Sequence, residues 1–198
     1  MISPPIKIAI TGTHSSGKTT FLQDVERELN SSGLRIRRIG DFARRARDLG
    51  FPILTKHTYE STLWIMAECL RCEAEASLQS DLILVDRPVI DALGYLLAAL
   101  QVSGRTLNSR RSAELLTIAT VHTPDYDVLI RTALDSNIEL GEGRDLDGEF
   151  RVAAATAIER LVDQIKPNAQ ILTSANGNEL IQRVVEIVRS RLSDGRSQ

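Results

Sequence analysis

The chain has 198 residues, of which 42% are hydrophobic and 25% are charged, a composition that is typical of a soluble globular protein and excludes a fibrous or wholly disordered chain. The 24 basic and 26 acidic residues give a formal net charge of −2, which argues against a strongly basic nucleic-acid-binding protein. There is no apolar run of membrane-spanning length, no signal-peptide core, and only two cysteines. We therefore expect a single cytoplasmic domain over residues 1–198, with no membrane partner.

Apolar runs of strand length alternate along the chain with longer segments of helical periodicity. Such alternation, with mostly buried strands, predicts an α/β protein of three layers in which helices cover both faces of a parallel sheet. In chain order the pattern predicts strand 6–10, helix 18–30, strand 34–39, helix 41–49, helix 59–78, strand 82–85, helices 89–100 and 110–121, strand 127–131, helix 150–165, strand 169–172 and helix 179–192.

Between the first strand and the first helix, Gly12–Thr19 fits the phosphate-loop pattern G-x-x-x-x-G-K-[ST] without a mismatch. Glycines in such a loop let backbone N–H groups surround phosphates, and the helix that follows presents its positive end to the anion. We expect Lys18 to reach the β- and γ-phosphates of ATP, with GTP as an alternative donor, and Thr19 to hold Mg²⁺. His14 is expected to face solvent, although it has the chemistry to contact a phosphate. The predicted nucleotide-binding residues are Gly12, Thr13, His14, Ser15, Ser16, Gly17, Lys18, Thr19 and Thr20.

Two carboxylates follow predicted strands: Asp86 ends the third, and Asp41 comes shortly after the second. Ligands bind at the carboxyl edge of such sheets, so both carboxylates should face the phosphate loop. Asp86 is predicted to hold Mg²⁺ or to accept a proton from an attacking hydroxyl group, and Asp41 is a second candidate for the base. We expect Arg87 and Arg44 to bind phosphate or substrate oxygens. The simpler alternative is that both aspartates cap helices and the arginines are solvated.

A polar, glycine-containing segment, Ser136–Gly148, predicts a mobile loop after the fourth strand. Phosphoryl transfer requires the exclusion of water and the neutralisation of charge on the transferred group, and a closing loop that carries arginines provides both. We therefore expect a lid over about 136–151, with Arg144 as its catalytic arginine and Arg151 and Arg131 as further candidates. The alternative is an ordinary surface loop.

Cys69 and Cys72 form a C-x-x-C pattern inside a predicted helix, and no second pair exists to complete a zinc site. We interpret them as ordinary thiols. The predicted helices 59–78 and 89–100 carry enough apolar surface to offer a homodimer face, so a homodimer is a further possibility.

Several blocks of this sequence together resemble the small P-loop kinases of the nucleoside and nucleotide kinase group, most closely the nicotinamide riboside kinase-like ATPases described as AAA-domain proteins. The resemblance implies an NMP-kinase-like fold with a five-strand sheet of order 2-3-1-4-5, Mg–ATP as the donor, and a nucleoside-like acceptor near Asp41, Arg44, Asp86 and Arg87. Asp41 stands where the family usually has Glu. The blocks are Gly12–Thr19 with its Ser15-Ser16 pair, Asp41–Arg44, Asp86-Arg87, and Gly143–Asp145 followed by Arg151.

The favoured function is therefore a kinase that moves the γ-phosphoryl group of Mg–ATP to a nucleoside- or nucleotide-like acceptor. One alternative is a regulatory NTPase that binds ATP or GTP and has no small acceptor. The chain lacks the Asn/Thr-Lys-x-Asp motif that reads guanine, which argues against a typical GTPase. A second alternative is a kinase that acts on a base or sugar within nucleic acid. The arginines between residues 35 and 47 permit it, but the net charge argues against it.

Overall fold

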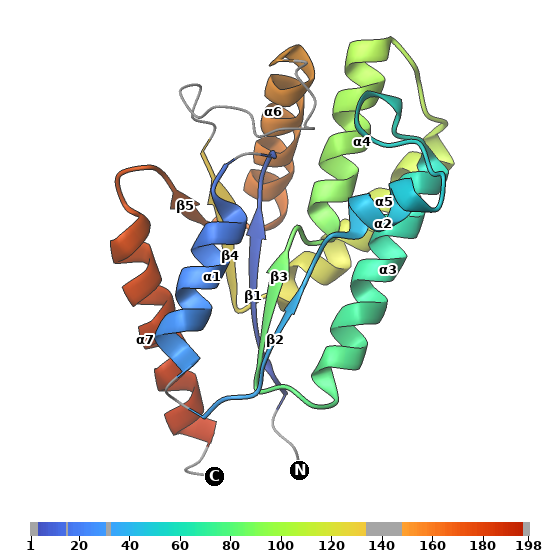
Figure 1. The fold of residues 1–198 in the computed structure, drawn as a ribbon. Helices are drawn as coiled ribbons and strands as arrows, with labels where there is room; N and C mark the ends of the chain where they lie inside the picture. Colours follow the sequence, from blue (N-terminus) through green and yellow to red (C-terminus); the bar gives the residue numbers. More distant parts are fainter. Residues whose placement is uncertain (1–3, 15, 31–32, 134–147, 196–198) are drawn as a thin grey trace.

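The computed structural model of the protein describes residues 4–14, 16–30, 33–133 and 148–195. Its strands form one parallel sheet in the order β2-β3-β1-β4-β5, which confirms the predicted topology (Figure 1). In the register of the two inner strands, Ile10 lies opposite Asp86, so the end of β3 lies beside the start of the phosphate loop. The strands are β1 (Ile6–Thr11), β2 (Ile36–Ile39), β3 (Leu82–Asp86), β4 (Val128–Thr132) and β5 (Gln170–Leu172).

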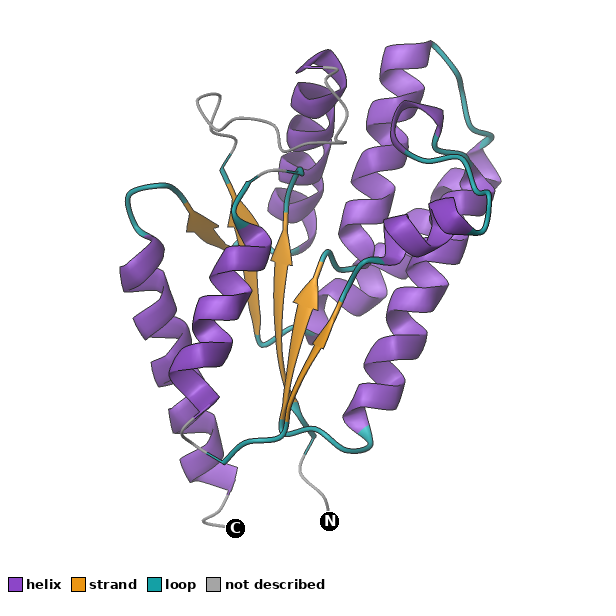
Figure 2. Cartoon of the chain, in the orientation of Figure 1, coloured by secondary structure: helices purple, strands orange, loops and turns teal. Residues whose placement is uncertain are grey.

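Helices cover both faces of this sheet and make the three layers that the alternating pattern predicts (Figure 2). Two short 3-10 helices, η2 (Leu54–Lys56) and η3 (Thr123–Asp125), stand between longer elements. Most predicted helix boundaries agree with the structure to within about three residues. The helices are α1 (Lys18–Leu29), α2 (Phe42–Asp48), α3 (Tyr59–Ser77), α4 (Val89–Ser103), α5 (Ser109–His122), α6 (Gly148–Ile165) and α7 (Gly177–Gly195).

Side chains alternate across the sheet and divide the core into two clusters. Ile8 and Ile10 of β1 point toward α1 and α7, whereas Ala9 points toward the layer that contains α3, α4 and α6. Most residues of α4 are buried, because neighbouring helices surround it. The apolar surface of α4 that suggested a dimer face is therefore covered within the chain, and a homodimer stays a prediction without that support.

The predicted lid falls mainly outside the described residues. Residues 134–147, which include Arg144, are not described, and neither is Ser15 of the phosphate loop. The last part of the predicted lid segment, from Gly148, belongs to the first turn of α6. Among the helices that the structure describes, none is both long enough and apolar enough to cross a bilayer.

Candidate active site

The phosphate-loop segment connects β1, at the centre of the sheet, with α1. Gly12 has φ +133° and Gly17 has φ +79°, conformations that side-chain-bearing residues rarely adopt. A Cβ atom at Gly12 would also overlap the hydroxyl of Thr132 at the end of β4. Glycine at these two positions therefore lets the chain turn from the strand into the helix while it passes close to β4.

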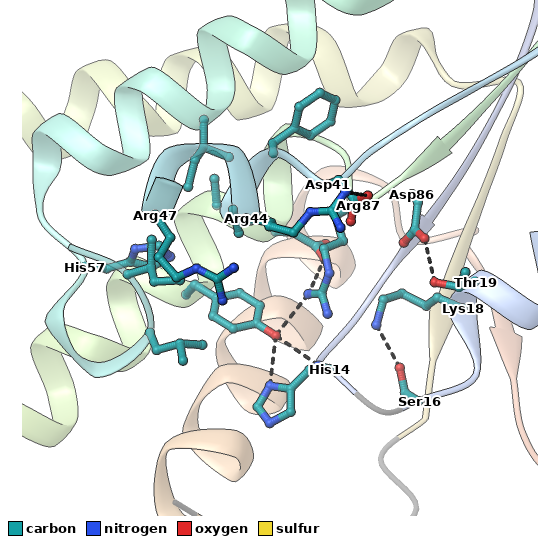
Figure 3. A pocket seen from close by; sticks show the side chains of 18 of the residues that line it. His14, Ser16, Lys18, Thr19, Asp41, Arg44, Arg47, His57, Asp86 and Arg87 are labelled. Carbon is teal, nitrogen blue, oxygen red and sulfur yellow. Dashed lines mark hydrogen bonds and ion pairs between the residues drawn. The ribbon is translucent and has the colours of Figure 1, made fainter. Parts of the chain in front are cut away.

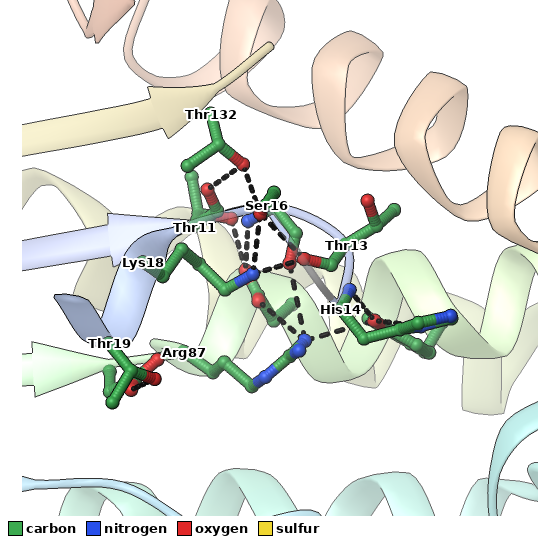
Figure 4. Close-up of polar contacts among 12 residues, drawn as sticks. Thr11, Thr13, His14, Ser16, Lys18, Thr19, Arg87 and Thr132 are labelled. Carbon is green, nitrogen blue, oxygen red and sulfur yellow. Dashed lines mark hydrogen bonds and ion pairs between the residues drawn. The ribbon is translucent and has the colours of Figure 1, made fainter. Parts of the chain in front are cut away.

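Lys18 is buried at the start of α1, and its ammonium group lies inside the loop (Figure 4). It donates hydrogen bonds to the Thr13 carbonyl and, at 2.9 Å, to Ser16 Oγ. Ser16 Oγ donates to the same Thr13 carbonyl at 2.7 Å and accepts from Thr132 Oγ1 at 2.8 Å. The loop thus holds a positive charge beside the N-terminus of a helix, an arrangement suited to an anion.

Asp86, at the carboxyl end of β3, accepts a hydrogen bond of 2.8 Å from Thr19 Oγ1. Close packing with Gly40 fixes the backbone here, because a Cβ atom at Gly40 would come within 3.0 Å of Asp86. Among the described residues, no group of three or more His, Cys, Asp or Glu side chains is placed to hold a metal ion. A hydroxyl and a carboxylate in contact are nevertheless the oxygen donors that Mg²⁺ prefers when phosphates and water complete its coordination.

A cavity of about 420 Å³ opens at this edge of the sheet (Figure 3). Its volume is in the usual range for small-molecule sites. The phosphate loop forms one side, α2 and the η2 region form the other, and the start of α4 lies between them. The cavity brings together these predicted site residues: His14, Ser16, Gly17, Lys18, Thr19, Thr20, Asp41, Arg44, Asp86 and Arg87.

Backbone strain is concentrated around the cavity. Within the described ranges, the non-glycine residues with positive φ are Asp41 (62°), Leu54 (57°) and Arg87 (70°), and all three line the cavity. A left-handed conformation costs an L-residue about 1–2 kcal/mol, somewhat less for Asp. Strain of this kind persists only where the surroundings enforce it, and it is found preferentially at functional sites.

On the side of the cavity across from the loop, Asp41 pairs with Arg44 at 2.7 Å, and both side chains are largely exposed. Asp41 precedes α2, but its side chain makes no capping hydrogen bond. The residue that precedes α4 is Pro88, and Asp86 bonds to Thr19 instead. Helix capping is therefore the wrong explanation for both aspartates.

The two described arginines that the sequence predicted from the fourth strand onward, Arg131 and Arg151, lie outside the lining of this cavity. Arg131 of β4 pairs with Glu159 of α6 at 2.6 Å, and Arg151 is buried on α6. Neither of them lines the cavity, and Arg144 lies outside the described residues. A role for Arg144 or Arg151 in phosphoryl transfer stays a prediction.

Among the polar residues that line the cavity, the sequence reasoning did not name His57, Asp91 and Tyr95. Asp91 and Tyr95 are four residues apart on α4, so they share one side of the helix, and Arg87 lies two residues before it; this spacing was the signal available in the sequence. The expectation that His14 faces solvent was wrong, because it is 8% exposed and packs against the Tyr95 hydroxyl.

The fold and the loop together define the class of the protein. A parallel sheet of order 2-3-1-4-5 with helices on both sides, and a phosphate-loop sequence between β1 and α1, make a P-loop fold of the NMP-kinase-like type. The chain belongs to the AAA domain family, whose model matches residues 7–179. No curated protein matched the sequence.

Solved structures share this fold at low sequence identity. A crystal structure of NadR protein in complex with NR superposes with a TM-score of 0.68 at 12% identity, and the match covers 92% of this chain and 51% of NadR. The present chain thus spans about half the length of NadR. Deoxyadenosine kinase from M. mycoides with bound dATP gives a TM-score of 0.56 at 15% identity, over 91% of this chain and all of that one. The same enzyme with the products dCMP and dCDP bound gives a TM-score of 0.55 at 14% identity, and the match covers 96% of this chain and 99% of the enzyme.

Two buried groups in the cavity wall have shifted pKa values. Burial lowers the pKa of His57 to about 4, although a hydrogen bond to the Pro52 carbonyl opposes the shift. Burial raises the pKa of Asp91 to about 6, against the attraction of Arg87 and Lys18. Since the folded state binds the Asp91 proton more tightly than the unfolded state does, this group favours folding at low pH and loses that contribution as the pH rises from about 4 to 6. His57 has the opposite sign, because the unfolded state binds its proton more tightly between pH 4 and 6.5.

We therefore expect opposite effects from two isolated substitutions when the pH is lowered from 6.5 to 4. Asp91→Asn should lose more stability than the wild type over this interval, and His57→Asn should lose less, each by on the order of 1–3 kcal/mol. Urea unfolding of the three proteins at both pH values measures these differences. Equal losses in all three would contradict the burial of these two ionisable groups.

Proposed function

We propose that the protein is a kinase that transfers the γ-phosphoryl group of Mg–ATP to a nucleoside- or nucleotide-like acceptor. The observation that carries this proposal is that the phosphate loop with Lys18 and the Asp41–Arg44 pair open on one cavity. A regulatory NTPase needs only the first of these two sides. NadR with bound NR and deoxyadenosine kinase share the fold, which is consistent with the proposal. GTP is an alternative donor.

On the donor side, the loop would bind the phosphates through its backbone N–H groups and the N-terminus of α1. The ammonium group of Lys18 would then exchange the Thr13 carbonyl for oxygens of the β- and γ-phosphates. That exchange replaces a contact with a neutral group by a contact with an anion, so it strengthens the hydrogen bond. Lys18 would thereby stabilise the charge that moves during transfer.

Thr19 and Asp86 fit the role of Mg²⁺ ligands, since their oxygens already lie 2.8 Å apart at the mouth of the loop. When bound, Mg²⁺ would neutralise charge on the phosphates. The two side chains would fix where that neutralisation occurs, because one belongs to α1 and the other to the end of β3. Asp86 is then engaged on the donor side.

Asp41 is the carboxylate left for the acceptor side. In the proposed reaction the acceptor oxygen bonds to the γ-phosphorus, the bond from that phosphorus to the β–γ bridging oxygen breaks, and ADP leaves. Where the acceptor is a hydroxyl group, Asp41 would take its proton. Arg44, held 2.7 Å from Asp41, would orient a substrate oxygen beside it. Arg144 and Arg151 would contribute from the predicted lid.

The test is transfer of labelled γ-phosphate from Mg–ATP or Mg–GTP to a panel of nucleosides, nucleoside monophosphates, nicotinamide riboside and short oligonucleotides. We expect Lys18→Ala to abolish transfer without unfolding the chain. The substitution removes the ammonium charge that would stabilise the transferred phosphoryl group, but it removes no apolar contact of the core. Lys56→Ala is the matched control, since Lys56 is exposed and does not line the cavity.

Near-normal turnover in folded Lys18→Ala would show that the loop does not bind the donor phosphates. Tight binding of nucleotide with label in none of the acceptors would favour the regulatory NTPase. A labelled oligonucleotide, with steep salt dependence, would favour the kinase that acts on nucleic acid.

Asp41→Asn tests the acceptor side separately from the donor side. Asn tolerates the positive φ of this position, so the fold should be unchanged. If Asp41 accepts the proton, kcat for a hydroxyl acceptor should fall about 10²–10⁴-fold while Mg–ADP binding is retained. Asp48→Asn is the control, because Asp48 is also exposed, pairs with Arg47 and does not line the cavity. A change of less than about threefold in Asp41→Asn would exclude Asp41 as the base.

A further inference from the structure

The hydroxyl group of Tyr95, on α4, contacts His14 of the phosphate loop and Arg87, which directly follows β3. It accepts hydrogen bonds of 3.0 Å from the backbone N–H of His14 and of 3.0 Å from Arg87 Nη1. Nδ1 of His14 lies 3.4 Å from the same oxygen. The ring itself is fixed by edge contacts with His57 and Phe150.

Asp91, one helical turn earlier, holds the start of the loop. Its Oδ1 accepts hydrogen bonds from the Thr11 hydroxyl and, at 3.4 Å, from the Gly12 N–H. Its Oδ2 lies 3.6 Å from Arg87 Nη1, and the same Arg87 nitrogen donates to the Gly12 carbonyl at 3.2 Å. Asp91 is 3% exposed, so these contacts are made away from solvent.

Arg87 lies between Tyr95 and Asp91 and contacts both of them as well as the Gly12 carbonyl. Although burial opposes its charge, Tyr95, Asp91 and Asp86 raise the pKa of Arg87, so its guanidinium group stays charged. The central carbon of that group, Cζ, also lies over the Tyr95 ring, 5.4 Å from the ring centroid. Apolar side chains dominate the rest of α4, whereas the polar atoms of Asp91 and Tyr95 converge on Arg87 and on residues 11–14. A carboxylate beside a phosphate site repels the ligand, so its presence there calls for a compensating role.

We propose that Tyr95 and Asp91 are positioning residues for phosphate binding: they fix the backbone of residues 11–14, directly and through Arg87, in the path that an oligophosphate requires. The loop is then preorganised before the nucleotide arrives, which saves the cost of ordering it during binding. This inference rests on the proposed function, because it presupposes that the loop binds the phosphates of a nucleotide.

Tyr95→Phe is the sharpest test, since it removes one oxygen and leaves the ring in place. We expect the affinity for Mg–pyrophosphate and for Mg–ADP, measured by calorimetry on the whole chain, to fall by the same factor, about tenfold. The same factor is expected for both ligands because the substitution changes only the contacts to the phosphates, which both ligands share. Tyr59→Phe is the control: it removes an exposed hydroxyl that bonds to Glu114 at 2.8 Å, and it should leave both affinities unchanged.

Two substitutions of Asp91 distinguish a positioning role from electrostatic repulsion of the phosphates. Coulomb repulsion alone predicts that both Asp91→Asn and Asp91→Ala bind pyrophosphate more tightly than the wild type. Positioning predicts that Asp91→Asn, which keeps an oxygen for Thr11 and Gly12, stays within about threefold of the wild type, and that Asp91→Ala binds at least about tenfold more weakly.

The outcomes are distinguishable. A wild-type chain that binds neither Mg–ADP nor Mg–pyrophosphate would overturn the proposed function and this inference with it. A wild-type chain that binds both, together with a folded Tyr95→Phe variant of unchanged affinity, would overturn the positioning role alone. A folded Asp91→Ala variant that binds pyrophosphate as tightly as the wild type would overturn the positioning role of Asp91.

Discussion

The backbone of residues 12–17 has to leave a buried strand and enter a helix while it keeps room for a phosphate chain, and the surrounding elements meet that requirement. Gly12 allows the loop to pass the end of β4, where a side chain would collide with Thr132. Ser16 and Lys18 bond to the loop carbonyl of Thr13 from within. Contacts from Asp91, Tyr95 and Arg87 hold the outer side of the same segment. The donor side of the cavity is therefore held by contacts from several elements.

The acceptor side is built differently, from strained and exposed residues. Asp41 and Leu54 hold left-handed conformations on this side of the cavity, while the sheet and its two helical layers supply the burial that sustains them. Asp41 and Arg44 are largely exposed and paired with each other. A phosphate site that many contacts hold, facing a more open site, suits a reaction in which positioning and charge stabilisation supply most of the catalysis.

Local sequence signals were sufficient to predict the strands, most helix ends and the contiguous phosphate loop, whereas the sheet order followed from the family resemblance. The loop motif is a short segment whose residues act together, and Asp86 is placed by the strand that precedes it. His57, Asp91 and Tyr95 escaped prediction because tertiary packing brings them to the site. On α4, the polar Asp91 and Tyr95 stand within a helix whose apolar composition indicated a core or dimer face. His14 was assigned to solvent because nothing local predicts a tyrosine from another element beside it.

The central claim is that this loop binds the phosphates of a nucleotide and that Lys18 changes partner when it does so. A crystal structure of the chain with Mg²⁺ and a non-hydrolysable ATP analogue tests it most directly. We predict that the phosphates lie in the loop, that Lys18 Nζ leaves the Thr13 carbonyl for β- and γ-phosphate oxygens, and that Mg²⁺ lies beside Thr19 and Asp86. A nucleotide bound elsewhere, with Lys18 still bonded to the Thr13 carbonyl, would contradict the account.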